Sequence, residues 1–288
     1  MTAAIRRRQR APRRALGFSM IELMISMVLG LVVIGAAVAI FLSSQHLYRS
    51  NEGLNRMQEN ARVAFELMSR DIRAAGGSAC SNASVVEGAG AEVERYRDAA
   101  VTGTSDSLRI VSGEDTAYKV VGSTSSSVTL DSAELPQAGD AFEVDDFLLL
   151  CNARKTHIVK ATSVAGMTVG FAALAGGYVP TSDEYAPPSA VVLARLRDVQ
   201  WSVRDNGRGG SSLYVSRMGA APEEVAEGVR DLAFTYLRAD ANQYVAAPAD
   251  WRDVTAVRIS MTLQGQGQDG AVLTRSVTNV VNMRGRTL

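Results

Sequence analysis

The sequence predicts an α+β protein in which one long N-terminal helix packs on a mainly antiparallel β-sheet body. The first observation is a run of 25 residues, 18–42, that contains a single ionisable side chain. The second is a helical spacing of apolar residues that continues to residue 75 without a proline. The third is a series of short β-like runs after residue 75, separated by glycine, serine and aspartate. The expected organisation is a leader at 1–17, a helix at 18–75 and a globular body at 76–288.

The leader is basic and carries no acidic residue. Six arginines precede Gly17: Arg6, Arg7, Arg8, Arg10, Arg13 and Arg14. A basic flank on this side of an apolar segment predicts that the leader stays in the cytoplasm and that the body is exported. Without the leader the chain has 24 basic and 30 acidic residues, a net charge of −6. An acidic body gives no support for a nucleic-acid partner.

The apolar run is long enough to cross a membrane. A helix rises about 1.5 Å per residue, so residues 18–42 span a hydrocarbon core about 30 Å thick. Glu22 is the only ionisable residue in this run, and an unpaired carboxylate in a bilayer costs about 2.5 kcal/mol or more. Two ordinary interpretations stay open. One is a secretory signal cut after Ala37-Val38-Ala39, and the other is a plain single-span anchor.

The block Gly17-Phe18-Ser19-Met20-Ile21-Glu22-Leu23 resembles the processing site of type IV prepilins. This resemblance implies that a dedicated prepilin peptidase cleaves after Gly17 and methylates Phe18, the new first residue. Glu22 then becomes the fifth residue, where its carboxylate would pair with the N-terminal amine of a neighbouring subunit. The implied partners are other minor and major pilins, the prepilin peptidase and an inner-membrane assembly platform.

Helical spacing continues beyond the membrane segment and turns amphipathic. Apolar residues recur at intervals of three, four or seven: Leu47, Leu54, Met57, Ala61, Ala64, Phe65, Met68 and Ile72. Charged residues occupy the opposite face, where Glu52–Arg56 and Glu66–Arg70 form acid-to-base pairs four residues apart. Gly76-Gly77 then predicts the end of the helix.

Three segments narrow the resemblance. The stretch from Ala61 to Gly76, followed by Cys80, is similar to the junction between helix and body in PilW proteins, and segments 227–236 and 251–259 fit as well. PilW proteins are large minor pilins, so the resemblance implies a pilin-like fold and a part in the initiation and assembly of type IV pili, which drive twitching motility. It also implies a single-pass inner-membrane protein with a periplasmic body that can join the pilus.

Two other functions remain open. One is the J-subunit type of pseudopilin in type II secretion, although that family is generally shorter and the long middle region here favours a pilus role. The other is a pilus-tip adhesin whose ligand would bind residues 81–190, a region that resembles no family we can name.

The body is expected to consist of antiparallel strands, because no helical pattern separates its β-like runs. The expected strands are 107–111, 118–121, 127–130, 141–150, 157–161, 168–171, 190–196, 199–204, 212–217, 232–237, 256–263 and 275–281. Residues 205–210, Asp-Asn-Gly-Arg-Gly-Gly, predict a hairpin. Cys80 and Cys151 are the only cysteines, and in an oxidising compartment they favour a disulfide. The alternative is two free buried thiols.

Catalytic, cofactor and metal motifs find little support. The two histidines, His46 and His157, have no motif partner, and the chain contains no Cys-x-x-Cys, phosphate-binding loop or Gly-x-Ser-x-Gly. We therefore expect a protein that is not an enzyme and binds no cofactor. The best metal candidate is calcium at the carboxylates between Asp140 and Asp146, and the alternative is a solvated strand face.

Overall fold

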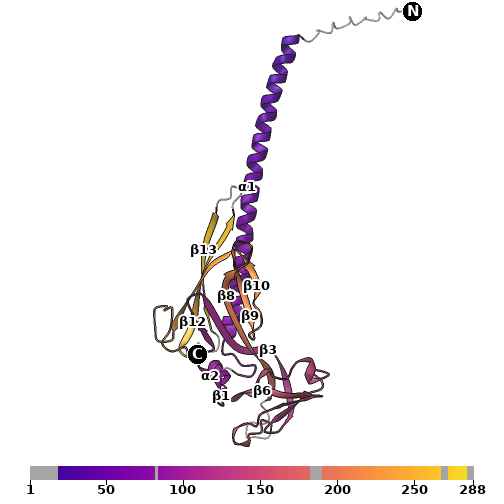
Figure 1. The fold of residues 1–288 in the computed structure, drawn as a ribbon, viewed down its shortest axis with the longest axis vertical. Coiled ribbons are helices and arrows are strands. Elements are labelled where there is room, and N and C mark those ends of the chain that lie inside the picture. Colours follow the sequence, from indigo (N-terminus) through magenta and orange to yellow (C-terminus); the bar gives the residue numbers. More distant parts are fainter. Residues whose placement is uncertain (1–18, 82–83, 182–189, 267–271, 284–288) are drawn as a thin grey trace, which may run out of the picture. The chain divides into compact units, whose positions relative to one another are not determined.

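The computed structural model of the chain describes residues 19–81, 84–181, 190–266 and 272–283. The α+β prediction is confirmed: a long N-terminal helix precedes a body of mainly antiparallel strands (Figure 1). The chain divides into two compact units, Met1–Glu52 and Gly53–Leu288. Each unit is described by itself below.

Helix α1 comprises Met20–Ala74. It begins where the carbonyl of Ser19 accepts the N–H groups of Glu22 at 3.0 Å and Leu23 at 3.2 Å. It ends at the predicted glycine pair, because Gly76 adopts φ 65° and donates its N–H to the carbonyl of Val111 at 2.9 Å. A left-handed backbone cannot continue a right-handed helix.

The part of α1 in the second unit buries one face. The fully or nearly fully buried apolar residues of this face are Met57, Ala61, Ala64, Met68 and Ile72. Their spacing of three or four residues places them on one stripe, as the sequence predicted. They join a core built with the strands that follow.

Thirteen strands and one short helix are described after α1. The strands are β1 Val85–Glu87, β2 Val101–Gly103, β3 Ser107–Ser123, β4 Ser127–Leu130, β5 Phe147–Cys151, β6 Lys155–Ala165, β7 Thr168–Phe171, β8 Val192–Asp205, β9 Ser211–Arg217, β10 Glu223–Glu227, β11 Val229–Arg238, β12 Val254–Gln266 and β13 Val272–Asn282. The helix is α2, Ala91–Asp98, and two 3-10 turns lie at Ala138–Asp140 and Ala175–Gly177.

Six strands close into a ring. Strand β3 pairs with β4, β4 with β7, β7 with β6, β6 with β5, β5 with β8, and β8 returns to β3. All six pairings are antiparallel, so the middle of the chain forms a small closed barrel. Its interior has its own apolar core: Val120, Val128, Leu130, Leu135, Ala138, Phe142, Leu148, Leu150, Val159, Ala161, Val169, Phe171, Val191 and Leu193. The resemblance to PilW did not reach this region.

Strands β3 and β8 connect the barrel to the rest of the body. Both are longer than predicted: β3 joins the expected strands 107–111 and 118–121, and β8 joins 190–196 and 199–204. An irregularity between Gly113 and Ala117 lets β3 leave one layer and enter the barrel. On the other side of this region β8, β9 and β10 pair antiparallel, and the predicted hairpin at 205–210 connects β8 to β9.

Strands β11, β12 and β13 form a separate three-stranded antiparallel sheet. Its inner face packs in the same core as α1, as β12 shows with buried Val257, Ile259, Met261 and Leu263. Tyr236 of β11 is fully buried and meets Trp251 edge to face, with ring centroids 4.8 Å apart.

Gly103 of β2 allows a close approach in this core. A side chain there would collide with the hydroxyl of Tyr236 and with the carbonyl of Ser107. The β2 backbone therefore reaches Tyr236 only because residue 103 has no Cβ.

Candidate processing and assembly site

Glu22 lies in the first turn of α1, four residues after Phe18. Its side chain is exposed, and no cation pairs with it among the residues that the structure describes. A carboxylate in this turn interacts favourably with the helix dipole, but the dipole does not replace a counter-ion in a membrane. Gly17 and Phe18, the predicted processing residues, lie outside the described residues.

The apolar part of α1 has the length and composition of a membrane span. The most apolar 18 residues within Met20–Gln45 have a mean hydropathy of 2.8, and none of them is buried. Large side chains such as Leu31, Val33 and Ile40 are more than 65% exposed. An added Cβ at Gly30 or Gly35 would meet no atom within 4 Å. The described chain therefore leaves this helix surface for lipid or for other helices.

A buried carboxylate joins α1 to β8. Asp71 accepts hydrogen bonds from the guanidinium of Arg197 at 2.6 Å and from the indole N–H of Trp201 at 2.9 Å. The Asp71 side chain is only 5% exposed, and Trp201 is fully buried. Buried carboxylates are stable when their oxygens are satisfied in this way. Asp71 therefore fixes the helix to the sheet at one position.

Sequence reasoning did not single out Asp71. The signal was present, because Asp71 lies three residues after Met68 and next to Ile72 on the buried stripe of the helix. A charged residue on an apolar stripe requires a partner inside the protein. The partner residues lie 126 and 130 positions away in the chain, so the pattern of the helix alone could not identify them.

Cys80 and Cys151 form a disulfide, with their Cα atoms 6.0 Å apart. The bond joins the segment that follows α1 to the end of β5, across 71 residues of sequence. Ser78 supports it by donating its hydroxyl to the sulfur of Cys151 at 3.3 Å. The cross-link therefore connects the exit of the helix to the closed barrel.

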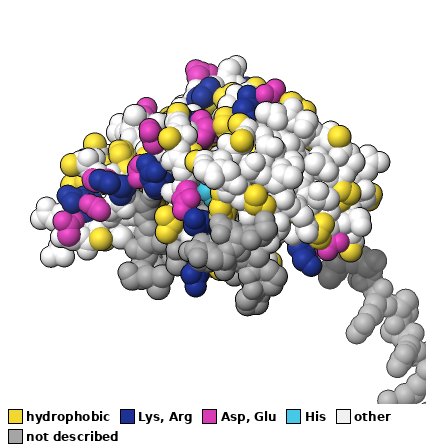
Figure 2. All heavy atoms as spheres, turned by 90° about the horizontal axis from the view of Figure 1, so that it is seen from below, with side chains coloured by type: hydrophobic (Ala, Val, Ile, Leu, Met, Phe, Trp, Pro, Cys, Tyr) yellow, Lys and Arg dark blue, Asp and Glu magenta, His cyan; other side chains and the backbone are white. Residues whose placement is uncertain are grey.

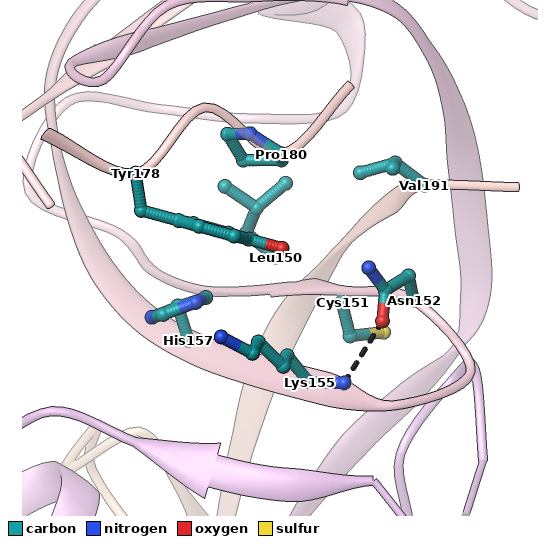
Figure 3. A pocket seen from close by; sticks show the side chains of 8 residues that line it. All are labelled: Leu150, Cys151, Asn152, Lys155, His157, Tyr178, Pro180 and Val191. Carbon is teal, nitrogen blue, oxygen red and sulfur yellow. Dashed lines mark hydrogen bonds between the residues drawn. The ribbon is translucent and has the colours of Figure 1, made fainter. Parts of the chain in front are cut away.

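A shallow hollow lies beside this disulfide at one end of β5 and β6 (Figure 3). The ring of Tyr178 lies 5.0 Å from that of His157, and the ammonium of Lys155 lies 4.9 Å from the centre of the Tyr178 ring. The hollow leaves no space for a guest the size of a water molecule. The described side chains of this hollow pack against one another.

His157 is buried, and burial is the main cause that lowers its pKa below the ordinary value. The carboxylate of Glu87, 4.0 Å from the imidazole Nε2, opposes the shift, and Lys155 adds to it. His157 is therefore held in its neutral form more firmly than a solvent-exposed histidine. It lies in β6 as a buried residue of the strand.

The acidic segment Asp140–Asp146 lies in turns before β5, and not on the strand 141–150 that the sequence predicted. Its carboxylates are engaged locally: Asp146 accepts the N–H of Glu143 at 2.8 Å and pairs with Arg195, and Asp145 pairs with Lys160 at 2.6 Å. Within the described part of the chain, no group of three or more His, Cys, Asp or Glu residues is placed to hold a metal ion.

Charged side chains of both signs are mixed on the surface of the body. Figure 2 shows Lys and Arg beside Asp and Glu over the face it presents. Ion pairs between side chains of the body include Lys155–Glu87 at 3.2 Å and Arg217–Glu223 at 2.7 Å. This face therefore presents no field of a single sign that would attract an anionic or cationic polymer.

An exposed apolar helix with an acid in its first turn, followed in the chain by an antiparallel β body, is consistent with a type IV pilin-like protein. The comparison with protein families agrees. Residues 12–38 match the model described as the prokaryotic N-terminal methylation motif. No curated protein and no solved structure matches the chain. The motif supports a membrane-anchored pilin or pseudopilin, and it implies processing by a prepilin peptidase and interaction with other pilins.

Proposed function

We propose that the chain is a minor pilin of the PilW type. It takes part in the initiation and assembly of a type IV pilus, after cleavage behind Gly17 and methylation of Phe18. The observation that carries this proposal is the methylation motif at residues 12–38 on a helix whose apolar surface is uncovered. In this proposal the protein is anchored in the bacterial inner membrane with its body in the periplasm, and it is not an enzyme.

Helix packing is the proposed means of assembly. The exposed apolar surface of Met20–Gln45 is covered by lipid before assembly and by the helices of other pilins afterwards. Glu22 sets the register, because the new amine at Phe18 of a neighbour supplies its missing counter-ion. An unpaired carboxylate at this depth costs about 2.5 kcal/mol or more, and the pairing removes much of this cost.

Replacement of Glu22 tests this mechanism. Glu22→Ala is expected to leave cleavage and methylation intact and to reduce incorporation into pili by at least tenfold, since about 1.4 kcal/mol corresponds to a factor of ten. Glu59→Ala removes an exposed carboxylate of the same helix in the second unit and is expected to incorporate normally. Purified pili blotted for this subunit provide the readout. Normal incorporation of Glu22→Ala would contradict the register role.

The pseudopilin alternative shares the motif and the helix, so it requires a test at the level of the cell. A deletion that abolishes twitching and leaves enzyme secretion intact supports the pilus role. The reverse result supports a type II secretion subunit. A tip adhesin would need a ligand of residues 81–190, the region that resembles no family we can name.

A further inference from the structure

Strand β13 forms a long edge of the three-stranded sheet. It comprises Val272–Asn282 and pairs with β12 on one side over eleven residues in an unbroken register. Among the residues that the structure describes, no strand pairs with its other side. Figure 1 shows β13 together with β12 in the body. This edge presents a row of backbone donors and acceptors.

The register identifies the residues that face outward. The N–H of Met283 donates to the carbonyl of Thr255 at 2.9 Å. Because hydrogen-bonded pairs alternate along an antiparallel ladder, the backbone N–H and C=O groups of the odd-numbered residues of β13 bond to β12. The N–H and C=O groups of the even-numbered residues point to the open side. The outward residues are Val272, Thr274, Ser276, Thr278, Val280 and Asn282. The hydrogen bond of Val280 supports this assignment. Its N–H donates to the side-chain oxygen of Asn279 at 2.8 Å and not to β12.

Strand β13 has few of the features that protect edge strands, and Arg275 is its one charged residue. Natural edges are short, bulged, or carry lysine or proline, since an open edge invites another strand. Strand β13 has no proline or lysine and no bulge against β12. The edge strand β10 has only five residues and a register break between Glu224 and Ala226. The edge strand β2 has three residues. The edge strand β11 is partly paired on its outer side, because Tyr236 and Val245 exchange backbone hydrogen bonds at 2.8 and 2.9 Å. Among the described edge strands, β13 is the longest and has no such pairing.

We propose that β13 is a docking strand on which an extended segment of a different pilin-class subunit adds as a further strand. This inference rests on the proposed function, because it assigns a surface of the body to the subunit contacts. Outward N–H and C=O groups at every second residue are matched by an extended backbone, which is the chemistry of β-strand addition. A partner anchored in the same membrane is presented at high effective concentration.

The charges at this edge favour a different subunit, and not a second copy of this chain, as the source of the added strand. Arg275 is exposed and has no ion-pair partner among the described residues, so the incoming strand should bring a carboxylate. A second copy offers β13, which brings only another Arg275, β2, which has no charged residue, or β10 and β11, whose carboxylates are already paired. Glu223 pairs with Arg217, and Glu224 pairs with Arg208.

The start of β13 lies at the level where α1 enters the body. Gly265 is the β12 partner of Leu273, and an added Cβ at Gly265 would come 2.6 Å from the sulfur of Met57. Among the residues of α1 whose burial the structure describes, Met57 is the first buried one, twelve positions after Gln45. The start of β13 therefore lies beside the first buried turn of α1 in the second unit.

Photo-crosslinking of the full-length protein in its native membrane tests the proposal. One photoreactive residue replaces Ser276 on the edge, and another replaces Ser26 in the apolar helix. Captured chains are identified by mass spectrometry. We expect the Ser276 probe to capture the body of another pilin-class subunit. In Thr278→Pro, which removes an outward N–H and no bond to β12, this capture should fall about fivefold, as expected for one net hydrogen bond.

Matched controls distinguish the loss of an edge hydrogen bond from a general loss of folding. Thr278→Ala keeps the N–H group and should capture like the wild type, and all variants are checked for the Cys80–Cys151 disulfide. If Thr278→Pro does not fold, Val280→Lys decides, because it adds an edge lysine at a side chain that is already 45% exposed. Its capture should fall as well.

The Ser26 probe distinguishes the two possible failures. The docking proposal is wrong if the Ser26 probe captures pilins while the Ser276 probe captures nothing or only a second copy of this chain. It is also wrong if the edge variants do not change the capture at Ser276. Loss of pilin capture at both probes would instead refute the proposed function.

Discussion

The carboxylate of Asp71 should carry much of the attachment of α1 to the body, and Asp71→Ala measures this. The substitution leaves the indole N–H of Trp201 buried without an acceptor, which costs about 1–3 kcal/mol. Arg197 is about a quarter exposed, so water compensates part of its lost pairing and about 1 kcal/mol more is lost. The total is about 3 kcal/mol, or a melting temperature lower by about 6–12 °C for a unit of this size.

Asp115→Ala is the matched control. Asp115 also pairs with an arginine of α1, Arg70, but both side chains are about two-thirds exposed, so the melting temperature should not change. The assay is thermal unfolding of full-length protein in detergent, followed by tryptophan fluorescence. Equal melting temperatures for Asp71→Ala and the wild type, or an equal loss in Asp115→Ala, would refute the assignment.

Three further predictions concern the body. Replacing Cys80 and Cys151 by alanine should cost about 4 kcal/mol for a closed loop of this length, and chemical denaturation would show no such loss if the bond were dispensable. Gly103→Ala should lower the free energy of unfolding by about 1–3 kcal/mol through overpacking. Gly122→Ala, where an added Cβ meets no atom, should change it little. Equal stabilities of the two variants in urea would contradict the close approach at Gly103. Since burial lowers the pKa of His157, stability should fall as pH drops below about 6.5. His157→Gln should show a smaller difference in melting temperature between pH 7.5 and 5.5, and an unchanged difference would argue against this role.

The sequence was sufficient to predict the helix and most strands. The apolar stripe of α1 and Gly76-Gly77 are local signals, and the helix follows them to within two residues at its start and one at its end. Strands β4 and β7 coincide with their predictions because their alternation is clear. Strand β10, Glu-Glu-Val-Ala-Glu, was missed because its exposed edge carries charges instead of apolar side chains. Helix α2 was missed because only Val93 and Tyr96 of its residues are buried.

Closure of the barrel could not be read from the sequence. It depends on β8 pairing with both β3 and β5, which are distant in the chain, and such register is set by packing between strands and not by local pattern. The hydrogen bonds of Asp71 could not be predicted for the same reason, because Arg197 and Trp201 are also distant in the chain. Glu22 was singled out from a short linear motif, within the matched residues 12–38, and its pairing with a neighbouring subunit stays a prediction.

The mature N-terminus tests the central claim most directly. Intact-mass and N-terminal peptide analysis of the protein from a host with a working prepilin peptidase should show a chain that begins at N-methylated Phe18. A chain that begins at Met1, or at Ile40 after an ordinary signal cleavage, would contradict the account.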